Sequence, residues 1–275
     1  MISQSCLFVI TLLFFTQVFC LPNFYQNSPS DASSSNNGRR ARQKEIPYHV
    51  AFRSRNFDFP FCSGVIIDSH WILTAADCLY YKQNDLQRIE VVYGATDLSD
   101  EGPGAVTSVE QVVIHPNYSV SLSTNNIALV KADGNLIQNK PRYKSGPVLM
   151  ASQSNVIGLG DQAVITGFGK EGEGYPIPSL YLKKARVSVY NGNQCSRMFE
   201  NYNQEQEFCA GRLGSGTCFD DPGPLVIDNK LIGFTSRCST TENLASYSRI
   251  SVYRDWIESV LTGSAYMEET LRSSS

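Results

Sequence analysis

Between residues 46 and 235 the chain alternates short apolar runs, rich in Val, Ile, Tyr and Phe, with Gly, Asn, Asp and Ser. Apolar runs of this length, bounded by turn residues, are typical of β-strands. Many short strands at this spacing predict an all-β protein, built as a sandwich or a barrel. The runs that we expect to form strands are Tyr48–Phe52, Gly64–Ile67, Trp71–Thr74, Ile89–Tyr93, Val106–Ile114, Ile127–Lys131, Gln162–Gly167, Lys183–Val189, Pro224–Ile227 and Leu231–Thr235.

A stretch near the C-terminus follows a helical period instead. Its apolar residues recur at the spacing of one helical face, and Gly263 follows them as a helix stop. The pattern predicts a C-terminal helix, followed by a polar tail over residues 262–275. The residues of that face are Val252, Trp256, Ile257, Val260 and Leu261.

The first 45 residues have a different composition. An apolar run within residues 1–20 is too short to span a bilayer, and its position at the start of the chain predicts a secretory signal peptide. A buried N-terminal strand is the alternative. Residues 21–45 are rich in Ser and Asn, which predicts a disordered pro-segment or tail. Within them, Arg39-x-x-Arg42 reads either as a processing site or as part of a solvated basic tail.

Composition and charge limit the partners. The chain has 275 residues, 42% of them hydrophobic, which is enough for a large core. A formal net charge of −3 gives no general basic field, so we expect no nucleic-acid partner. We also expect no membrane partner, because no later segment is long and apolar enough. Asn117 begins the glycosylation sequon Asn117-Tyr118-Ser119 beside an expected surface turn.

Six of the eight cysteines lie beyond the expected signal peptide and fall along the chain as three close pairs. An even number of cysteines after an export signal indicates disulfides. A zinc site is disfavoured because the chain has no C-x-x-C and only three histidines, and we expect no cofactor or metal. The six cysteines are Cys62, Cys78, Cys195, Cys209, Cys218 and Cys238.

The segment FCSGVIIDSHWILTAADCL, residues 61–79, resembles the first barrel of the chymotrypsin-like serine proteases. Later motifs of that family follow in the right order, among them Thr166-Gly167-Phe168-Gly169 and Tyr247-Ser248-Arg249-Ile250. The resemblance covers about residues 46–261 and implies two six-stranded antiparallel β-barrels with a C-terminal α-helix. It also implies three disulfides, Cys62–Cys78, Cys195–Cys209 and Cys218–Cys238.

The positions that carry catalysis in that family hold other residues here. Acyl transfer needs an attacking serine, a histidine base and an aspartate that orients the histidine. By the resemblance, Asp77 replaces the histidine and Asn126 the aspartate. The serine is either replaced by Asp221 or deleted, because the loop is one residue shorter than the family's. This implies a pseudoprotease without catalytic residues. An alternative is that Asp77 and Asp221 face each other and share a proton or hold a cation.

Positions that bind substrate in the family also depart from its pattern. Gly216 stands where trypsin-like members keep an acidic residue, and Ala245 stands at a pocket-wall position that is usually glycine. The strand that pairs with the substrate backbone is reduced to Thr235-Ser236-Arg237 before Cys238. We therefore expect a cleft that is narrowed or closed to an extended peptide.

The segments GFGKEGEGYPIPSL and YRDWIES are most similar in sequence to the scabies mite inactivated serine protease paralogues, which are related to mite group 3 allergens. That resemblance implies a secreted, extracellular protein of the gut lumen that binds host proteins, complement components above all, and interferes with complement. We expect a monomer. The alternatives are a non-catalytic cofactor of an active protease cascade and residual hydrolysis. Candidate binding loops are Tyr80–Leu86, Ser99–Val106 and Gly169–Tyr175.

Overall fold

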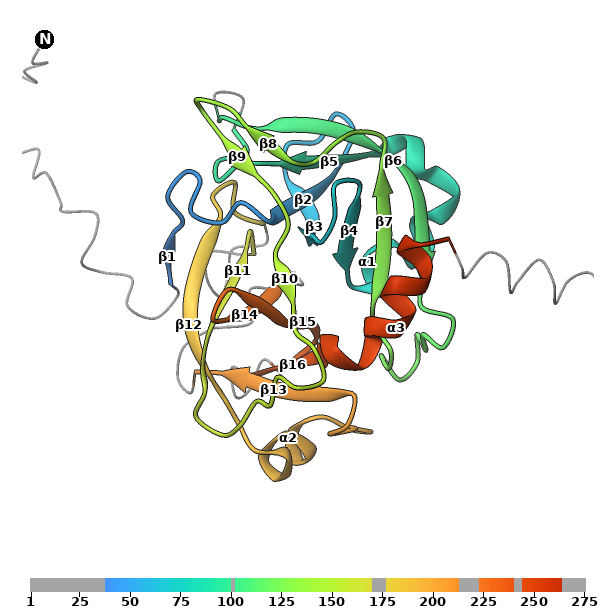
Figure 1. Cartoon of the computed structure of the whole chain (residues 1–275), viewed down its shortest axis with the longest axis vertical. Coiled ribbons are helices and arrows are strands. Elements are labelled where there is room, and N and C mark those ends of the chain that lie inside the picture. Colours follow the sequence, from blue (N-terminus) through green and yellow to red (C-terminus); the bar gives the residue numbers. More distant parts are fainter. Residues whose placement is uncertain (1–37, 100–101, 170–176, 213–222, 240–243, 264–275) are drawn as a thin grey trace, which may run out of the picture. The chain divides into compact units, whose positions relative to one another are not determined.

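The computed structural model describes residues 38–99, 102–169, 177–212, 223–239 and 244–263. Two β-barrels make up most of this part of the chain (Figure 1). The expected signal peptide, most of the expected pro-segment and most of the polar tail lie outside the described residues.

The first barrel is closed and antiparallel, with its strands in the order β2-β3-β4-β7-β6-β5. Its core is filled by aliphatic and aromatic side chains, many of them β-branched, and all four residues of β4 are buried. Such side chains favour strands because they pack well on a pleated, half-buried surface. The strands are β2 (His49–Ser54), β3 (Pro60–Ile66), β4 (Trp71–Thr74), β5 (Ile89–Tyr93), β6 (Ala105–Ile114) and β7 (Ala128–Ala132).

The second barrel contains six antiparallel strands in the order β12-β11-β14-β15-β16-β13, and a β12–β13 pairing closes it. Two short strands extend its sheet, β1 (Arg39–Arg40) beside β12 and β10 (Leu149–Met150) beside β15. The expected two-barrel fold is therefore confirmed. The barrel strands are β11 (Gln162–Gly167), β12 (Lys183–Val189), β13 (Glu207–Gly211), β14 (Pro224–Ile227), β15 (Lys230–Ser239) and β16 (Leu244–Arg249).

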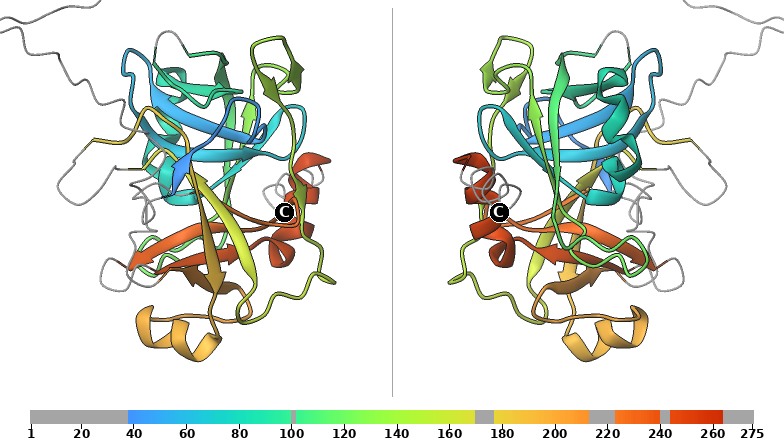
Figure 2. Two further views of the ribbon diagram at one scale, coloured as in Figure 1. Left: turned by 90° about the vertical axis from the view of Figure 1, so that its left-hand side faces the viewer. Right: turned by 90° about the vertical axis from the view of Figure 1, so that its right-hand side faces the viewer.

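Helices and one small ribbon complete the described fold (Figure 2). The predicted C-terminal helix is α3 (Ile250–Leu261), which buries Ile250, Tyr253, Ile257 and Val260. The helix α2 begins with a capping box, in which Asn191 and Gln194 satisfy each other's backbone N–H groups. The remaining elements are α1 (Ala76–Leu79), the 3₁₀ segment η1 (Tyr80–Arg88), α2 (Gly192–Met198), and the paired strands β8 (Gln138–Asn139) and β9 (Lys144–Ser145).

The start of the folded domain differs from the sequence-based prediction. Residues 38–45 belong to the expected disordered segment, yet Arg39 and Arg40 pair with β12. Glu45 holds this segment by ion pairs to Arg39 and to Lys184 Nζ at 2.9 Å. Gly38 has a φ of +78°, and a Cβ there would lie 2.4 Å from the Lys184 carbonyl oxygen. The Arg39-x-x-Arg42 sequence therefore lies in ordered structure, and a cut after Arg42 would detach β1 from the domain.

Two disulfides link elements of the described fold. Cys62 in β3 is bonded to Cys78 in α1, and Cys195 in α2 is bonded to Cys209 in β13. The expected partner of Cys238, Cys218, lies outside the described residues. No helix among the residues that the structure describes is long and apolar enough to cross a membrane.

Candidate functional site

Asp77 and Asn126, predicted to stand at two catalytic positions, are in direct contact. Asp77 lies in α1, and Asn126 lies just before β7. The backbone N–H of Asp77 donates to Asn126 Oδ1 at 3.0 Å, and Asn126 Nδ2 donates to Asp77 Oδ2 at 3.0 Å. Asn126 Nδ2 also donates to the carbonyl oxygen of Ser236 in β15, at 3.1 Å. The amide therefore joins α1 of the first barrel to a strand of the second.

Asn126 is buried, whereas Asp77 keeps an exposed surface but lies partly desolvated beside the first barrel. This desolvation raises the pKa of the Asp77 carboxyl above its usual range, although the hydrogen bond from Asn126 acts in the opposite direction. Tyr118 lies nearby, and burial, together with the charge of Asp77, raises its pKa to about 12. The rings of Tyr80 and Tyr118 meet edge to face, with centroids 5.4 Å apart. Asp77 is exposed and contacts the Asn126 amide, and no cation is paired to it among the described residues.

None of the three histidines of the chain is hydrogen-bonded to Asp77 or Asn126. His70 lies exposed on the turn between β3 and β4, 3.0 Å from the Ser69 hydroxyl. His115 packs edge to face against Tyr253 and Trp256, and burial lowers its pKa to about 4. Neither imidazole is oriented by a carboxylate in the described structure.

His49 forms a polar cluster between the barrels that sequence reasoning missed. Its Nδ1 lies 2.9 Å from Thr166 Oγ1 in β11, and its Nε2 lies 3.1 Å from Ser63 Oγ in β3. A histidine between two hydroxyls has the composition of a nucleophile with its base, but all three residues are buried, and His49 is only 1% exposed. Burial lowers the pKa of His49 to about 3, so the imidazole is neutral. The cluster joins the two barrels and offers no access to a substrate.

The strand expected to pair with substrate is engaged within the protein at Arg237. Arg237 forms an ion pair with Glu207 in β13 and donates from Nη1 to the carbonyl oxygen of Glu200. Burial raises the pKa of Glu207, and the charge of Arg237 opposes that rise. The guanidinium also lies over the Phe199 ring, 5.3 Å from its centroid. Arg237 is therefore held against the second barrel by three separate contacts.

Of the remaining predicted site residues, the structure describes Ala245 and Asn117. Ala245 lies buried in β16, paired in register with Ala210 and Cys238. Asn117 is exposed in the turn after β6, where its N–H donates to His115 Nδ1 at 3.2 Å. Asp221 and Gly216 lie outside the described residues, so the predicted Asp77–Asp221 carboxylate pair stays a prediction.

Two closed six-stranded barrels, joined by the hydrogen bond from Asn126 to Ser236, define a protein of the chymotrypsin-like fold. Residues 35–257 match the Trypsin family, and the chain belongs to that family. A curated relative, trypsin of Phaedon cochleariae, is 28% identical over 228 residues, which cover 80% of this chain and 85% of that one.

Solved structures agree with this assignment. Neuropsin, a serine protease expressed in the limbic system of mouse brain, is 29% identical, with a TM-score of 0.69 over 82% of this chain and 98% of its own. A protein described as GrC has a TM-score of 0.71 at 24% identity, over 82% of this chain and 98% of its own. A mutant of human heparin binding protein has a TM-score of 0.68 at 24% identity, over 82% and 95%. The last two likenesses concern the fold alone.

Proposed function

We propose that this trypsin-family protein is a secreted pseudoprotease that acts by binding other proteins and interferes with host complement. The observation that supports the proposal is the hydrogen-bonded Asp77–Asn126 pair, because the family resemblance predicts a histidine and an aspartate at these two positions. Residues 1–20 are then a signal peptide that is removed on export. The two disulfides of the described fold fit an oxidising compartment.

The chemistry of the pair supports the loss of hydrolysis. A serine nucleophile must lose its proton to a base as it attacks, and in this family an imidazole takes it. Asn126 is neutral and cannot stabilise an imidazolium, and its amide is already committed to Asp77 and Ser236. The three histidines of the chain are held elsewhere, at a turn, against aromatic rings and between the barrels. Among the described residues, we therefore expect no acid–base pair of the family's mechanism to be available to a substrate.

Binding to proteins is favoured over binding to heparin. The net charge of −3 is unchanged by removal of the signal peptide, which contains no charged residue. A polyanion needs a broad basic face, which this balance does not supply. Complement as the target rests on the resemblance to the scabies mite paralogues, and the alternative is a cofactor that docks an active protease.

The proposal predicts that the purified, exported protein inhibits complement in human serum in a dose-dependent way, assayed separately for each activation pathway. Inhibition should be unchanged by prior treatment with a covalent serine-protease inhibitor, because binding, not cleavage, produces it. Protein that has been reduced and alkylated serves as the unfolded control. Loss of inhibition after inhibitor treatment would show proteolysis instead. Inactivity in all pathways, with acceleration of an added active protease, would favour the cofactor alternative.

A further inference from the structure

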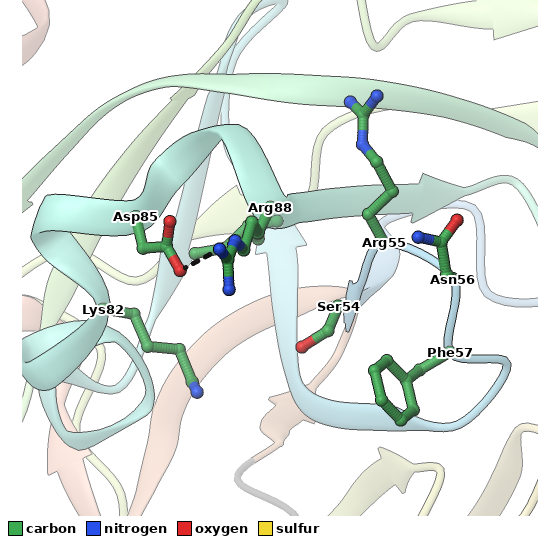
Figure 3. A pocket seen from close by; sticks show the side chains of 8 residues that line it. Ser54, Arg55, Asn56, Phe57, Lys82, Asp85 and Arg88 are labelled. Atoms are coloured by element: carbon green, nitrogen blue, oxygen red, sulfur yellow. Dashed lines mark ion pairs between the residues drawn. The ribbon is translucent and has the colours of Figure 1, made fainter.

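A pocket of about 510 Å³ lies between η1 and the connection from β2 to β3 (Figure 3). Lys82, Asp85 and Arg88 line it from η1, and Arg55 and Phe57 line it from the β2–β3 connection. Three of these five side chains are cationic and one is acidic, in a chain whose net charge is −3. The pocket is thus a local basic site on an acidic protein.

The cations of the pocket are weakly engaged by the protein itself. Lys82 forms no ion pair with a described residue, and its Nζ lies 4.7 Å from the centroid of the Phe61 ring. Arg88 lies 3.4 Å from Asp85, with the Arg88 side chain 76% exposed. Arg55 lies 3.9 Å from Glu90, whose other oxygen is already paired to Arg53 at 3.0 Å. These cations therefore keep N–H donors for an external anion.

The walls of the pocket are held in place before any ligand arrives. The N–H of Arg55 donates to the carbonyl oxygen of Arg88 at 2.7 Å, which ties the two walls together. The N–H of Phe57 donates to the carbonyl oxygen of Ser54 at 3.0 Å, and Asn56 between them takes a φ of +70° in the turn. A site that is already ordered loses less conformational entropy on binding.

Exposed aromatic side chains lie beside the basic groups. Phe57 is 68% exposed and Phe59 is 42% exposed, on the same connection between β2 and β3. Aromatic residues and arginine are enriched at protein interfaces, where they form the anchoring contacts. A polysaccharide would need a longer basic track, whereas a few cations beside exposed phenylalanines suit a short peptide that carries acidic and apolar residues.

We propose that this pocket binds an acidic peptide segment of a partner protein, with carboxylates paired to Lys82 and Arg88 and an apolar side chain against Phe57. The inference rests on the proposed protein-binding function for the nature of the partner. It places recognition on η1, which includes the candidate loop Tyr80–Leu86, and on the connection from β2 to β3.

The test measures binding of a fluorescein-labelled decapeptide of alternating Glu and Leu by fluorescence anisotropy. A Gln-Leu decapeptide and a heparin oligosaccharide are the comparison probes. The double variant Lys82→Glu/Arg88→Glu is set against Arg186→Glu/Arg197→Glu, which makes the same change of charge at exposed sites on β12 and α2 of the second-barrel region. Thermal unfolding of all three proteins establishes that each is folded.

The expected result is binding of the Glu-Leu peptide that weakens as salt is added, because ion pairs are screened. Lys82→Glu/Arg88→Glu should weaken it at least about tenfold, and the control variant should change it by less than about threefold. The proposal would be overturned if the wild-type protein did not bind the peptide, or if both double variants lost the same affinity for it. It would also be overturned if Lys82 and Arg88 bound heparin more tightly than the peptide. Serum inhibition is a separate readout, so peptide binding without it would reject the complement function and leave the pocket standing.

Discussion

Asn126→Asp is expected to destabilise the protein by about 1–3 kcal/mol at pH 7, although aspartate is the residue that the family resemblance predicts at this position. The change would bring a second carboxylate to about 3 Å from Asp77 Oδ2, where Asn126 Nδ2 now donates. It would also leave the carbonyl oxygen of Ser236 without the donor that it has at 3.1 Å. Position 126 is buried whereas Asp77 is exposed, so the new carboxyl at 126 loses most of its hydration and faces the charge of Asp77, and both effects raise its pKa.

Chemical denaturation of Asn126→Asp at pH 7 and at pH 4.5 measures this effect. A carboxyl group whose pKa is raised in the folded state keeps its proton after the unfolded chain has lost it, so stability falls as the pH rises. The deficit of the variant should therefore shrink at pH 4.5. The double variant Asp77→Asn/Asn126→Asp restores one amide and one carboxylate and should recover much of the loss. An Asn126→Asp protein as stable as the wild type at pH 7 would contradict the pairing.

His49→Gln is expected to remove much of the acid sensitivity of the fold. The pKa of His49 is about 3 in the folded protein, against about 6.5 for an unperturbed histidine. Below pH 6.5 the unfolded chain binds a proton that the folded protein excludes, so stability falls as the pH falls. Between pH 7 and pH 4.5 this group alone removes about 2–3 kcal/mol from the free energy of unfolding.

The comparison of wild type and His49→Gln isolates this contribution, because the other titrating groups are common to both proteins. Glutamine can donate to one of the two hydroxyls, Thr166 and Ser63, and accept from the other. His70→Gln, at the exposed turn, is the matched control and should keep the wild-type difference between the two pH values. A His49→Gln protein that loses as much stability in acid as the wild type would show that His49 is protonated in the folded state.

The strands could be predicted from the sequence wherever local pattern and burial agree. The expected bounds of β4, β5, β11, β12 and β14 match the structure, because apolar residues in those runs end at turn residues. The bounds of α3 were close, since its apolar face and Gly263 mark both its register and its end. The capping box of α2, Asn191 with Gln194, was a readable helix start that the apolar pattern alone does not reveal.

The long-range polar contacts could not be read from local pattern. Glu207 begins β13, although a charged residue disfavours a buried strand. The ion pair with Arg237 of β15, thirty residues further along the chain, compensates for its burial. The family motifs predicted which sites Asp77 and Asn126 occupy, but they did not predict the hydrogen bond from Asn126 to Ser236. His49, Ser63 and Thr166 are distant in sequence and meet only because the two barrels pack together. Likewise, residues 38–45 read as a polar tail because the partners that order them, β12 and Lys184, lie far along the chain.

The most direct test of the pseudoprotease assignment is the reaction of the purified, exported protein with a fluorophosphonate serine probe and a broad peptide-substrate library, beside active trypsin. Loss of a catalytic triad lowers turnover roughly a millionfold. A pseudoprotease should show no stoichiometric labelling by the probe and hydrolysis no faster than the buffer control. Labelling of one serine per molecule, with hydrolysis that the probe abolishes, would contradict it.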